Sequence, residues 1–265
     1  MDRINILWTG GFDSTYRVCQ LSLMPVEVQA YYISANRISE PQERKAMAEI
    51  VDYINANEEK KCELLPLIVI HIDDYPQDQQ ILDAFNRLRK EEVVGTQFEW
   101  FARFAKYEDI KLELGMERNV GGVSKALFAK FGKIKESSLA LEGGAGTLDF
   151  CELDARHSTG DLMTIYGHFR FGLPLFKMSK LETLEAYKTL GYEDVVRMTW
   201  FCAQPVNGKP CGLCNPCESA LRANMNFRIP LRSRILNKIF KKNRLGNYIF
   251  VKLRLIYYRI RGLNL

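Results

Sequence analysis

Four of the seven cysteines fall within sixteen consecutive positions near the C-terminal end of the sequence. Their spacing is Cys-x8-Cys-x2-Cys-x2-Cys, and the four are Cys202, Cys211, Cys214 and Cys217. Four thiolates at this spacing can close a tetrahedral shell around one Zn²⁺ ion and leave no position open for catalysis. We therefore predict a structural zinc site. An iron–sulfur cluster uses a similar Cys-x2-Cys-x2-Cys pattern and remains an alternative.

A second group of residues that could do chemistry occupies positions 8–15, Trp-Thr-Gly-Gly-Phe-Asp-Ser-Thr, between a short apolar run and an amphipathic stretch. Gly10 and Gly11 allow positive φ and let backbone N–H groups converge on an anion. The hydroxyls of Ser14 and Thr15, at the start of a helix, would complete a cradle of the size of a phosphate.

Asp13 decides which anion this loop would take. Its carboxylate would repel a bare phosphate, but it suits a Mg²⁺ ion, which prefers one or two carboxylates together with phosphate oxygens. The segment matches neither the Walker A pattern nor the dinucleotide fingerprint. The alternative is a plain strand-to-helix turn, in which the glycines serve chain geometry and an Asp or Ser side chain caps the helix.

Residues 9–15 resemble the Ser-Gly-Gly-x-Asp-Ser loop of the PP-loop ATP pyrophosphatases, with Thr9 in the place of the usual serine. Members of that superfamily cleave ATP between its α- and β-phosphates and transfer AMP to an oxygen of the substrate. The resemblance implies ATP and Mg²⁺ as ligands. It also implies nucleotide contacts at residues 32–36, which include Ser34, and at the end of the third strand, from His71 to Asp73. A satisfied, partly buried His71 and a solvated turn at residues 73–74 are the alternatives. The implied pyrophosphate-binding residues are Thr9, Gly10, Gly11, Asp13, Ser14 and Thr15.

The later part of the sequence resembles a narrower family, the 7-cyano-7-deazaguanine synthases, which form a nitrile in queuosine biosynthesis. The resemblance covers about residues 3 to 222. It implies that Lys180 approaches the ATP phosphates, where an ammonium would stabilise the charge that builds on the leaving pyrophosphate. A surface lysine at a helix entrance is the alternative, and Lys177 is a weaker candidate. The landmarks, in chain order, are residues 173–182, Leu190-Gly191, Thr199-Trp-Phe-Cys202 and residues 210–217.

The substrate side of this resemblance differs from the family pattern. Residues 94–100 read Val-Gly-Thr-Gln-Phe-Glu-Trp where an Arg-Asn pair is usual, and residues 114–119 keep Gly115 without the following Asn-x-x-Asp. The implied chemistry is adenylation of a small-molecule carboxylic acid, followed by attack of ammonia to give an amide or a nitrile. The alternatives are a relative acting on another acid, in surface-polysaccharide or defence chemistry, and a tRNA-modifying PP-loop protein. A zinc-binding adaptor without catalysis is a further alternative.

Short apolar runs alternate with amphipathic stretches along the body of the chain, which predicts an α/β fold with a doubly wound, mostly parallel sheet. We predict strands over residues 4–8, 29–33, 67–72 and 110–114. Residues 142–160 are rich in glycine and polar residues and are interpreted as a loop or a short irregular strand. Helices are predicted over residues 13–23, 41–53, 83–89, 98–107, 124–131 and 181–190. Ser179 followed by Glu182 predicts a capping box at the start of the last of these helices.

The charge distribution separates a body from a tail. The chain of 265 residues has a net charge of +5, yet it has no acidic residue after Glu218 and twelve basic residues from Arg222 onward. We predict a PP-loop domain over residues 1–222, which includes the cysteine element at about 199–222, and a basic amphipathic extension over 223–265. Residues 235, 239 and 242 and residues 249, 253, 256 and 260 follow helical spacing.

The partners of the basic extension are left open by the sequence. A basic amphipathic helix suits an anionic membrane surface, a nucleic acid or an acidic protein, and it can also pack on the acidic body or on a second subunit in a homodimer. The sequence shows no signal peptide and no apolar run of spanning length, so we expect a cytoplasmic protein that could be peripheral to a membrane through this extension.

Overall fold

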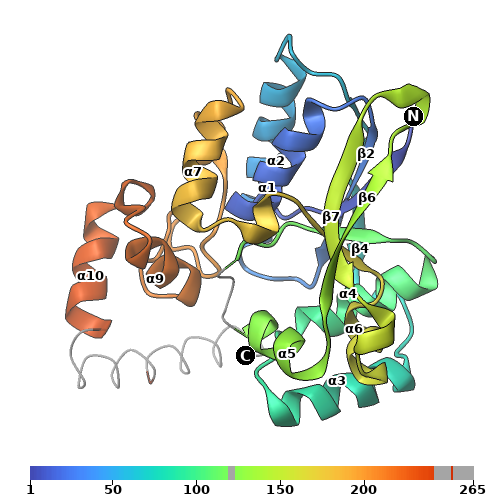
Figure 1. Cartoon of the computed structure of the whole chain (residues 1–265). Coiled ribbons are helices and arrows are strands. Elements are labelled where there is room, and N and C mark those ends of the chain that lie inside the picture. The colour runs from blue at the N-terminus through green and yellow to red at the C-terminus, as the bar shows by residue number, and fades with distance from the viewer. Residues whose placement is uncertain (119–122, 242–251, 253–265) are drawn as a thin grey trace. The chain divides into compact units, whose positions relative to one another are not determined.

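A computed structural model describes residues 1–118, 123–241 and 252 of the chain (Figure 1). Its central feature is one mixed, mostly parallel sheet with the strand order β3-β2-β1-β5-β8-β7-β6, and β4 also pairs with β2. The predicted α/β fold class is therefore confirmed. The strands are β1 (Arg3–Leu7), β2 (Glu27–Ser34), β3 (Glu63–Leu64), β4 (Ile68–His71), β5 (Leu112–Leu114), β6 (Ile134–Ala140), β7 (Thr147–Leu153) and β8 (Phe169–Gly172).

The helices of the sheet-bearing part cover both faces of the sheet. The chain moves from β1 to β2 toward one edge of the sheet, and from β4 it moves back past β1 to β5, toward the other edge. Because both crossovers are right-handed, the helices of the first connection and those of the second lie on opposite faces of the sheet. The helices before residue 200 are α1 (Phe12–Ser22), α2 (Glu40–Asn55), α3 (Gln79–Glu91), α4 (Gln97–Tyr107), α5 (Val123–Phe131), α6 (Gly160–Tyr166), α7 (Lys180–Thr189) and α8 (Val195–Met198).

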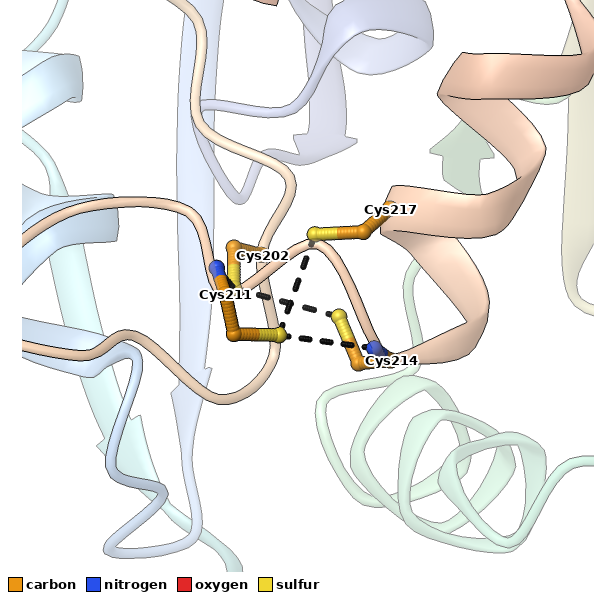
Figure 2. A group of neighbouring side chains, drawn as sticks. All are labelled: Cys202, Cys211, Cys214 and Cys217. Atoms are coloured by element: carbon orange, nitrogen blue, oxygen red, sulfur yellow. Dashed lines mark hydrogen bonds between the residues drawn. The ribbon is translucent and has the colours of Figure 1, made fainter. Parts of the chain in front are cut away.

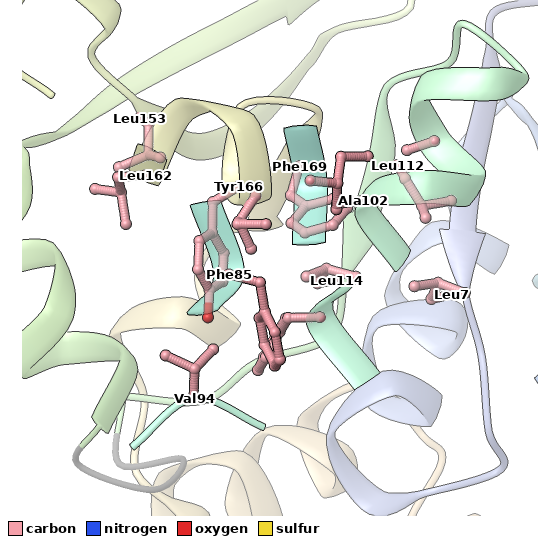
Figure 3. Close-up of a cluster of buried hydrophobic side chains, with 14 of the residues drawn as sticks. Leu7, Phe85, Val94, Ala102, Leu112, Leu114, Leu153, Leu162, Tyr166 and Phe169 are labelled. Carbon is pink, nitrogen blue, oxygen red and sulfur yellow. The ribbon is translucent and has the colours of Figure 1, made fainter. Parts of the chain in front are cut away.

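A cluster of buried hydrophobic side chains lies between the sheet and the helices α3, α4 and α6 (Figure 3). Leu112 and Leu114 of β5 and Phe169 of β8 point into it and meet Phe85 of α3 and Tyr166 of α6. All five side chains are buried, so their removal from water contributes much of the stability of this layer. The aromatic rings contact one another at centroid distances near 5–6 Å, for example 5.9 Å between Tyr166 and Phe169.

One prediction for the sheet was wrong. Residues 147–153, inside the segment interpreted as a loop or short irregular strand, form the regular seven-residue strand β7, which pairs antiparallel with both β6 and β8. Its partner β6 was not predicted, because most of its side chains are polar and exposed and give no apolar signal. The hairpin forms because backbone pairing in register, from Ile134 with Leu153 to Ala140 with Thr147, compensates for the weak side-chain pattern.

Contacts group the chain into two compact units: residues 1–36 with 43–200, and residues 37–42 with 201–265. The first unit holds the sheet, and the second holds α9 (Asn215–Arg222) and α10 (Leu231–Lys241). Helix α10 confirms helical structure around residues 235 and 239, whereas Lys242 and the second apolar stripe at 249–260 lie outside the described residues. The domain boundary predicted at residue 222 stays a prediction.

Within the residues that the structure describes, no helix combines the length and the hydropathy that a membrane crossing requires.

Candidate functional site

In the loop between β1 and α1, only one of the two adjacent glycines uses the positive φ that the sequence allowed. Gly10 adopts φ +65°, and Gly11 is the N-cap of α1 in an extended conformation. A side chain at Gly10 would be strained, and a Cβ there would lie only 2.9 Å from the carbonyl oxygen of Glu43. The N–H groups of the first turn of α1 have no partner inside the helix, so this end of α1 can receive an anion.

Two further contacts hold the loop. The backbone N–H of Trp200 donates to the carbonyl oxygen of Gly10 at 2.8 Å. The indole Nε1–H of Trp8 donates to Oγ1 of Thr15 at 2.9 Å. Thr15 is fully buried, so its hydroxyl stabilises the loop from the interior. Its predicted contact with a phosphate stays a prediction.

The other predicted loop residues lie at the edge where the parallel strands end. Thr9 and Asp13 are half-buried, and Ser14 is buried with its Oγ 3.5 Å from the carbonyl oxygen of Gly11. Ser34 is half-buried at the last position of β2, opposite His71 of β4. Carboxyl ends of parallel strands meet at one edge of a sheet, which is where ligands bind in folds of this class. The predicted nucleotide contacts at Ser34 and His71 stay predictions.

His71 itself has a local structural role. Its ring bonds Asn36 at 3.0 Å, and its Nδ1 accepts from the backbone N–H of Asp73 at 3.3 Å. The carboxylate of Asp74 accepts from the backbone N–H of His71, which completes a capping box. These contacts begin the short 3₁₀ turn Ile72–Asp74 at the end of β4.

Lys180 and Asp13 come together although 167 positions separate them in the sequence. Lys180 Nζ lies 3.2 Å from both carboxylate oxygens of Asp13. On its other side it lies 3.1 Å from Oε1 of Glu117. The exposed fractions of the three side chains are 21% for Lys180, 20% for Asp13 and 4% for Glu117. One ammonium thus bridges two carboxylates in a largely enclosed place.

Glu117 is a member of this cluster that the sequence reasoning missed. It follows β5, which pairs directly with β1, so its position at the carboxyl edge of that strand was the available signal. Burial, and then repulsion from Asp13, raise the pKa of Glu117, against the opposing effect of Lys180. Its Oε2 atom is buried and has no hydrogen-bond partner among the described residues. A buried carboxylate oxygen without a hydrogen-bond partner can act as a ligand of a cation.

Close packing between the loop after β5 and the first turn of α1 places Glu117. A Cβ at Gly115 would lie 2.3 Å from Cα of Ser14, so only glycine fits there. Three residues on, the backbone N–H of Arg118 donates to the carbonyl oxygen of Met178 at 2.8 Å, just before α7. The loop is thereby tied both to α1, which carries Asp13, and to the segment leading to Lys180.

Helix α7 is positioned by a capping box and by aromatic contacts. Ser179 Oγ accepts from the backbone N–H of Glu182, and the Glu182 carboxylate accepts from the N–H of Ser179, as the sequence predicted. The hydroxyl of Tyr187 donates to the carbonyl oxygen of Phe12 at 2.6 Å, and the two rings lie 5.2 Å apart. These contacts bring Lys180, the first residue of α7, to Asp13.

A buried ion pair fixes α1 on the sheet beneath this cluster. The guanidinium of Arg17 contacts both carboxylate oxygens of Glu113 in β5, and its Nη1 donates to the carbonyl oxygen of Leu173 at 3.0 Å. Both charged side chains are almost completely buried. Because an unpaired charge there would be costly, the pair specifies the orientation of α1. Lys177, by contrast, is exposed and pairs with Glu136 at 2.6 Å.

The four cysteines of the second unit form a compact buried cluster (Figure 2). Their sulfur atoms all lie within 4.8 Å of one another, and the pairs Cys202–Cys214 and Cys211–Cys217 are 3.8 and 3.9 Å apart. A tetrahedron with Zn–S distances of about 2.3 Å has edges of about 3.8 Å. No disulfide links them. The cluster therefore has the donor set and the spacing for a metal ion such as zinc.

Backbone amides surround these sulfurs. The N–H of Cys211 donates to Sγ of Cys202 at 3.2 Å, and the N–H of Gly212 donates to Sγ of Cys217 at 3.3 Å. Gly212 has φ +79°, which lets the chain wrap tightly after Cys211. Hydrogen bonds from neighbouring thiols, that of Cys202 first, lower the pKa of Cys211, whereas they raise the pKa of Cys217. Amides aimed at sulfur favour bound thiolates.

No protein-family model matches the chain, and no curated protein matches it.

Proposed function

We propose that this chain is an ATP-dependent carbon–nitrogen ligase that adenylates a carboxylic acid and then uses ammonia to form an amide or a nitrile, in the manner of the 7-cyano-7-deazaguanine synthases. The observation that carries the proposal is the meeting of Lys180 and Asp13, 3.2 Å apart, beside the glycine loop. A lysine and a carboxylate placed there have the charges that a nucleoside triphosphate and its cation require.

The residues have separate roles in this proposal. The N–H groups of residues 10–15 bind the β- and γ-phosphates of ATP, and the ammonium of Lys180 neutralises charge on the departing pyrophosphate. Asp13 and Glu117 would hold Mg²⁺, which fits the unpartnered buried oxygen of Glu117. Bound there, Mg²⁺ supplies neutralising charge and orients the phosphates. Lys180, which contacts both carboxylates here, would be free to turn toward the phosphates once they are neutralised by the cation.

The proposed reaction needs no co-substrates other than ATP and ammonia. An oxygen of the substrate carboxylate attacks the α-phosphorus, the bond to the bridging oxygen breaks, and pyrophosphate leaves. Ammonia then attacks the acyl carbon, loses a proton and displaces AMP, which gives the amide. A second ATP then adenylates the amide oxygen and releases a second pyrophosphate, and loss of AMP and of both protons on the amide nitrogen gives the nitrile. Positioning and charge stabilisation account for the contribution of the protein.

The four-cysteine cluster serves this function as a structural zinc site in our proposal. All four sulfurs are buried and spaced for one tetrahedral ion, which leaves no open coordination position for a substrate. We assign zinc to the folding of residues 201–241 and give it no catalytic step.

The test is an incubation of the purified protein with ATP, Mg²⁺, ammonia and 7-carboxy-7-deazaguanine, with products identified by mass spectrometry. AMP, pyrophosphate and the nitrile together support the full proposal. AMP and pyrophosphate that depend on a different acid keep the reaction and replace the substrate. The variant Asp13→Asn should lose the reaction, whereas Asp52→Asn, an exposed aspartate on α2, should retain it. Absence of ATP binding in the wild-type protein would contradict the proposal and favour a non-catalytic adaptor.

A further inference from the structure

One side of helix α10 faces the cysteine loop. Ser233 Oγ donates to the carbonyl oxygen of Pro210 at 2.7 Å, and Asn237 Nδ2 donates to the carbonyl oxygen of Gly212 at 2.7 Å. The approach is close, since a Cβ at Gly212 would lie 2.3 Å from the carbonyl oxygen of Ser233. Helix α10 is therefore fastened to the cysteine loop by polar side chains on one of its faces.

The opposite side of α10 is apolar and exposed. At about 100° per residue, positions 231, 235 and 239 line one face, opposite the side that carries the two polar anchors. The exposed fractions are 64% for Leu231, 49% for Ile235 and 54% for Ile239. We call these three residues the apolar face of α10. Leu236 and Phe240, on the anchored side, are half-buried, so the exposed line of aliphatic residues comes in addition to the inward apolar residues that a surface helix ordinarily has.

Basic residues border this apolar face. Arg232 lies on one side of it and Lys238 on the other, and both are exposed. No aspartate or glutamate occurs anywhere in the sequence after Glu218, whereas twelve lysines and arginines occur from Arg222 onward. The face thus combines large aliphatic side chains with uncompensated positive charge.

We propose that the apolar face of α10 docks on an anionic lipid surface. The aliphatic side chains enter the boundary between headgroups and acyl chains, while Arg232 and Lys238 reach the lipid phosphates. A nucleic acid would satisfy the basic residues but would leave the line of aliphatic side chains without apolar contacts. A second copy, face to face, would bring like charges together with no acidic partner on the described face. An anionic bilayer offers apolar contacts to the aliphatic side chains and negative charge to the basic ones.

The experiment measures binding of the full-length protein to sedimentable vesicles of phosphatidylcholine alone and of phosphatidylcholine mixed with phosphatidylglycerol. We expect binding to the anionic vesicles only, and weaker binding as salt rises, because the screening length falls from about 10 Å at 0.1 M to about 3 Å at 1 M. The double variant Ile235→Gln/Ile239→Gln should lower the partition coefficient about tenfold or more, because two aliphatic side chains no longer enter the acyl boundary.

The matched control is Val93→Gln, an exposed aliphatic residue between α3 and α4, which should bind vesicles as the wild type does. Circular dichroism checks that the double variant stays folded. Equal binding by the double variant and the wild type would overturn the proposal, since the charge of residues 242–265 would then suffice. Absence of vesicle binding would also overturn it. So would sedimentation showing a dimer that the double variant dissociates, or tighter binding to RNA than to vesicles.

Discussion

The cysteine cluster and the cluster of Asp13, Glu117 and Lys180, which we call the loop cluster, differ in how far apart in the chain their parts lie. All four sulfurs of the cluster come from residues 202–217, and amides from the same short segment surround them. At the loop, Asp13, Glu117 and Lys180 come from the first helix, from the turn after β5 and from the start of α7. The cluster depends on local spacing, whereas the loop cluster depends on the whole sheet being assembled.

This difference predicts how each site fails. Loss of a single ligand at the cysteine cluster should unfold the segment around it, because metal binding and local folding are the same event. Loss of a side chain at the loop should remove chemistry while leaving the fold intact, because the sheet and the Arg17–Glu113 pair hold the elements in place.

The largest effect is expected for Cys217→Ser. Removing one thiolate should reduce bound zinc from one ion per chain to almost none and abolish cooperative folding of residues 201–241, since structural zinc provides about 10–16 kcal/mol of apparent binding energy in zinc-finger peptides. Metal analysis and thermal unfolding measure both effects. Cys62→Ser is the control, as that cysteine is buried in the other unit and outside the cluster. Recovery of iron and sulfide with the wild-type protein would replace zinc by an iron–sulfur cluster.

The next effect concerns Lys180→Met, which keeps the length of the side chain and removes its charge. We expect pyrophosphate release to fall about 10²–10³-fold, the usual cost of deleting one group that stabilises transition-state charge. Thermal stability should change little. Lys177→Met is the matched control, because that lysine is three residues away, exposed and paired with Glu136. Similar losses in both variants would show that Lys180 has no specific role.

A steric change tests the packing of the loop cluster. Gly115→Ala should destabilise the protein by about 1–3 kcal/mol, because the new methyl group would meet Cα of Ser14. Urea unfolding measures this, and the affinity for ATP should fall with it as α1 moves. Gly160→Ala is the control, since no atom lies within 4 Å of a Cβ at that position. Equal free energies of unfolding for Gly115→Ala and the wild type would show that the loop after β5 and the first turn of α1 are not tightly packed in solution.

The smallest effect is a pH dependence of the Mg²⁺ requirement. Glu117 must be ionised to bind Mg²⁺, and burial raises its pKa, so the Mg²⁺ concentration for half-maximal activity should rise as the pH falls through that raised pKa. The raised pKa also means that this carboxyl favours folding while protonated and that its contribution falls as the pH rises above the unfolded value. Glu117→Gln should remove both dependences, and a Mg²⁺ requirement that stays equally pH-dependent in that variant would exclude Glu117 as a ligand.

The sequence by itself determined the features that depend on neighbouring residues. From apolar periodicity it predicted the strands β1, β2, β4 and β5 and the helices α1–α5 and α7. It also predicted the four-cysteine cluster from its spacing and the capping box at Ser179 from residue types three apart. Each is a short-range pattern, so no knowledge of the rest of the chain was needed.

Tertiary structure decided what distant segments do together. The strand β7 forms because β6 and β8 flank it, and its own residues gave only a weak signal. Glu117 joins Asp13 and Lys180 because parallel strands β1 and β5 are neighbours in the sheet. The outward apolar face of α10 follows from the bonds that Ser233 and Asn237 make to the cysteine loop. Helical periodicity identifies an apolar face, but only packing determines which face meets the solvent.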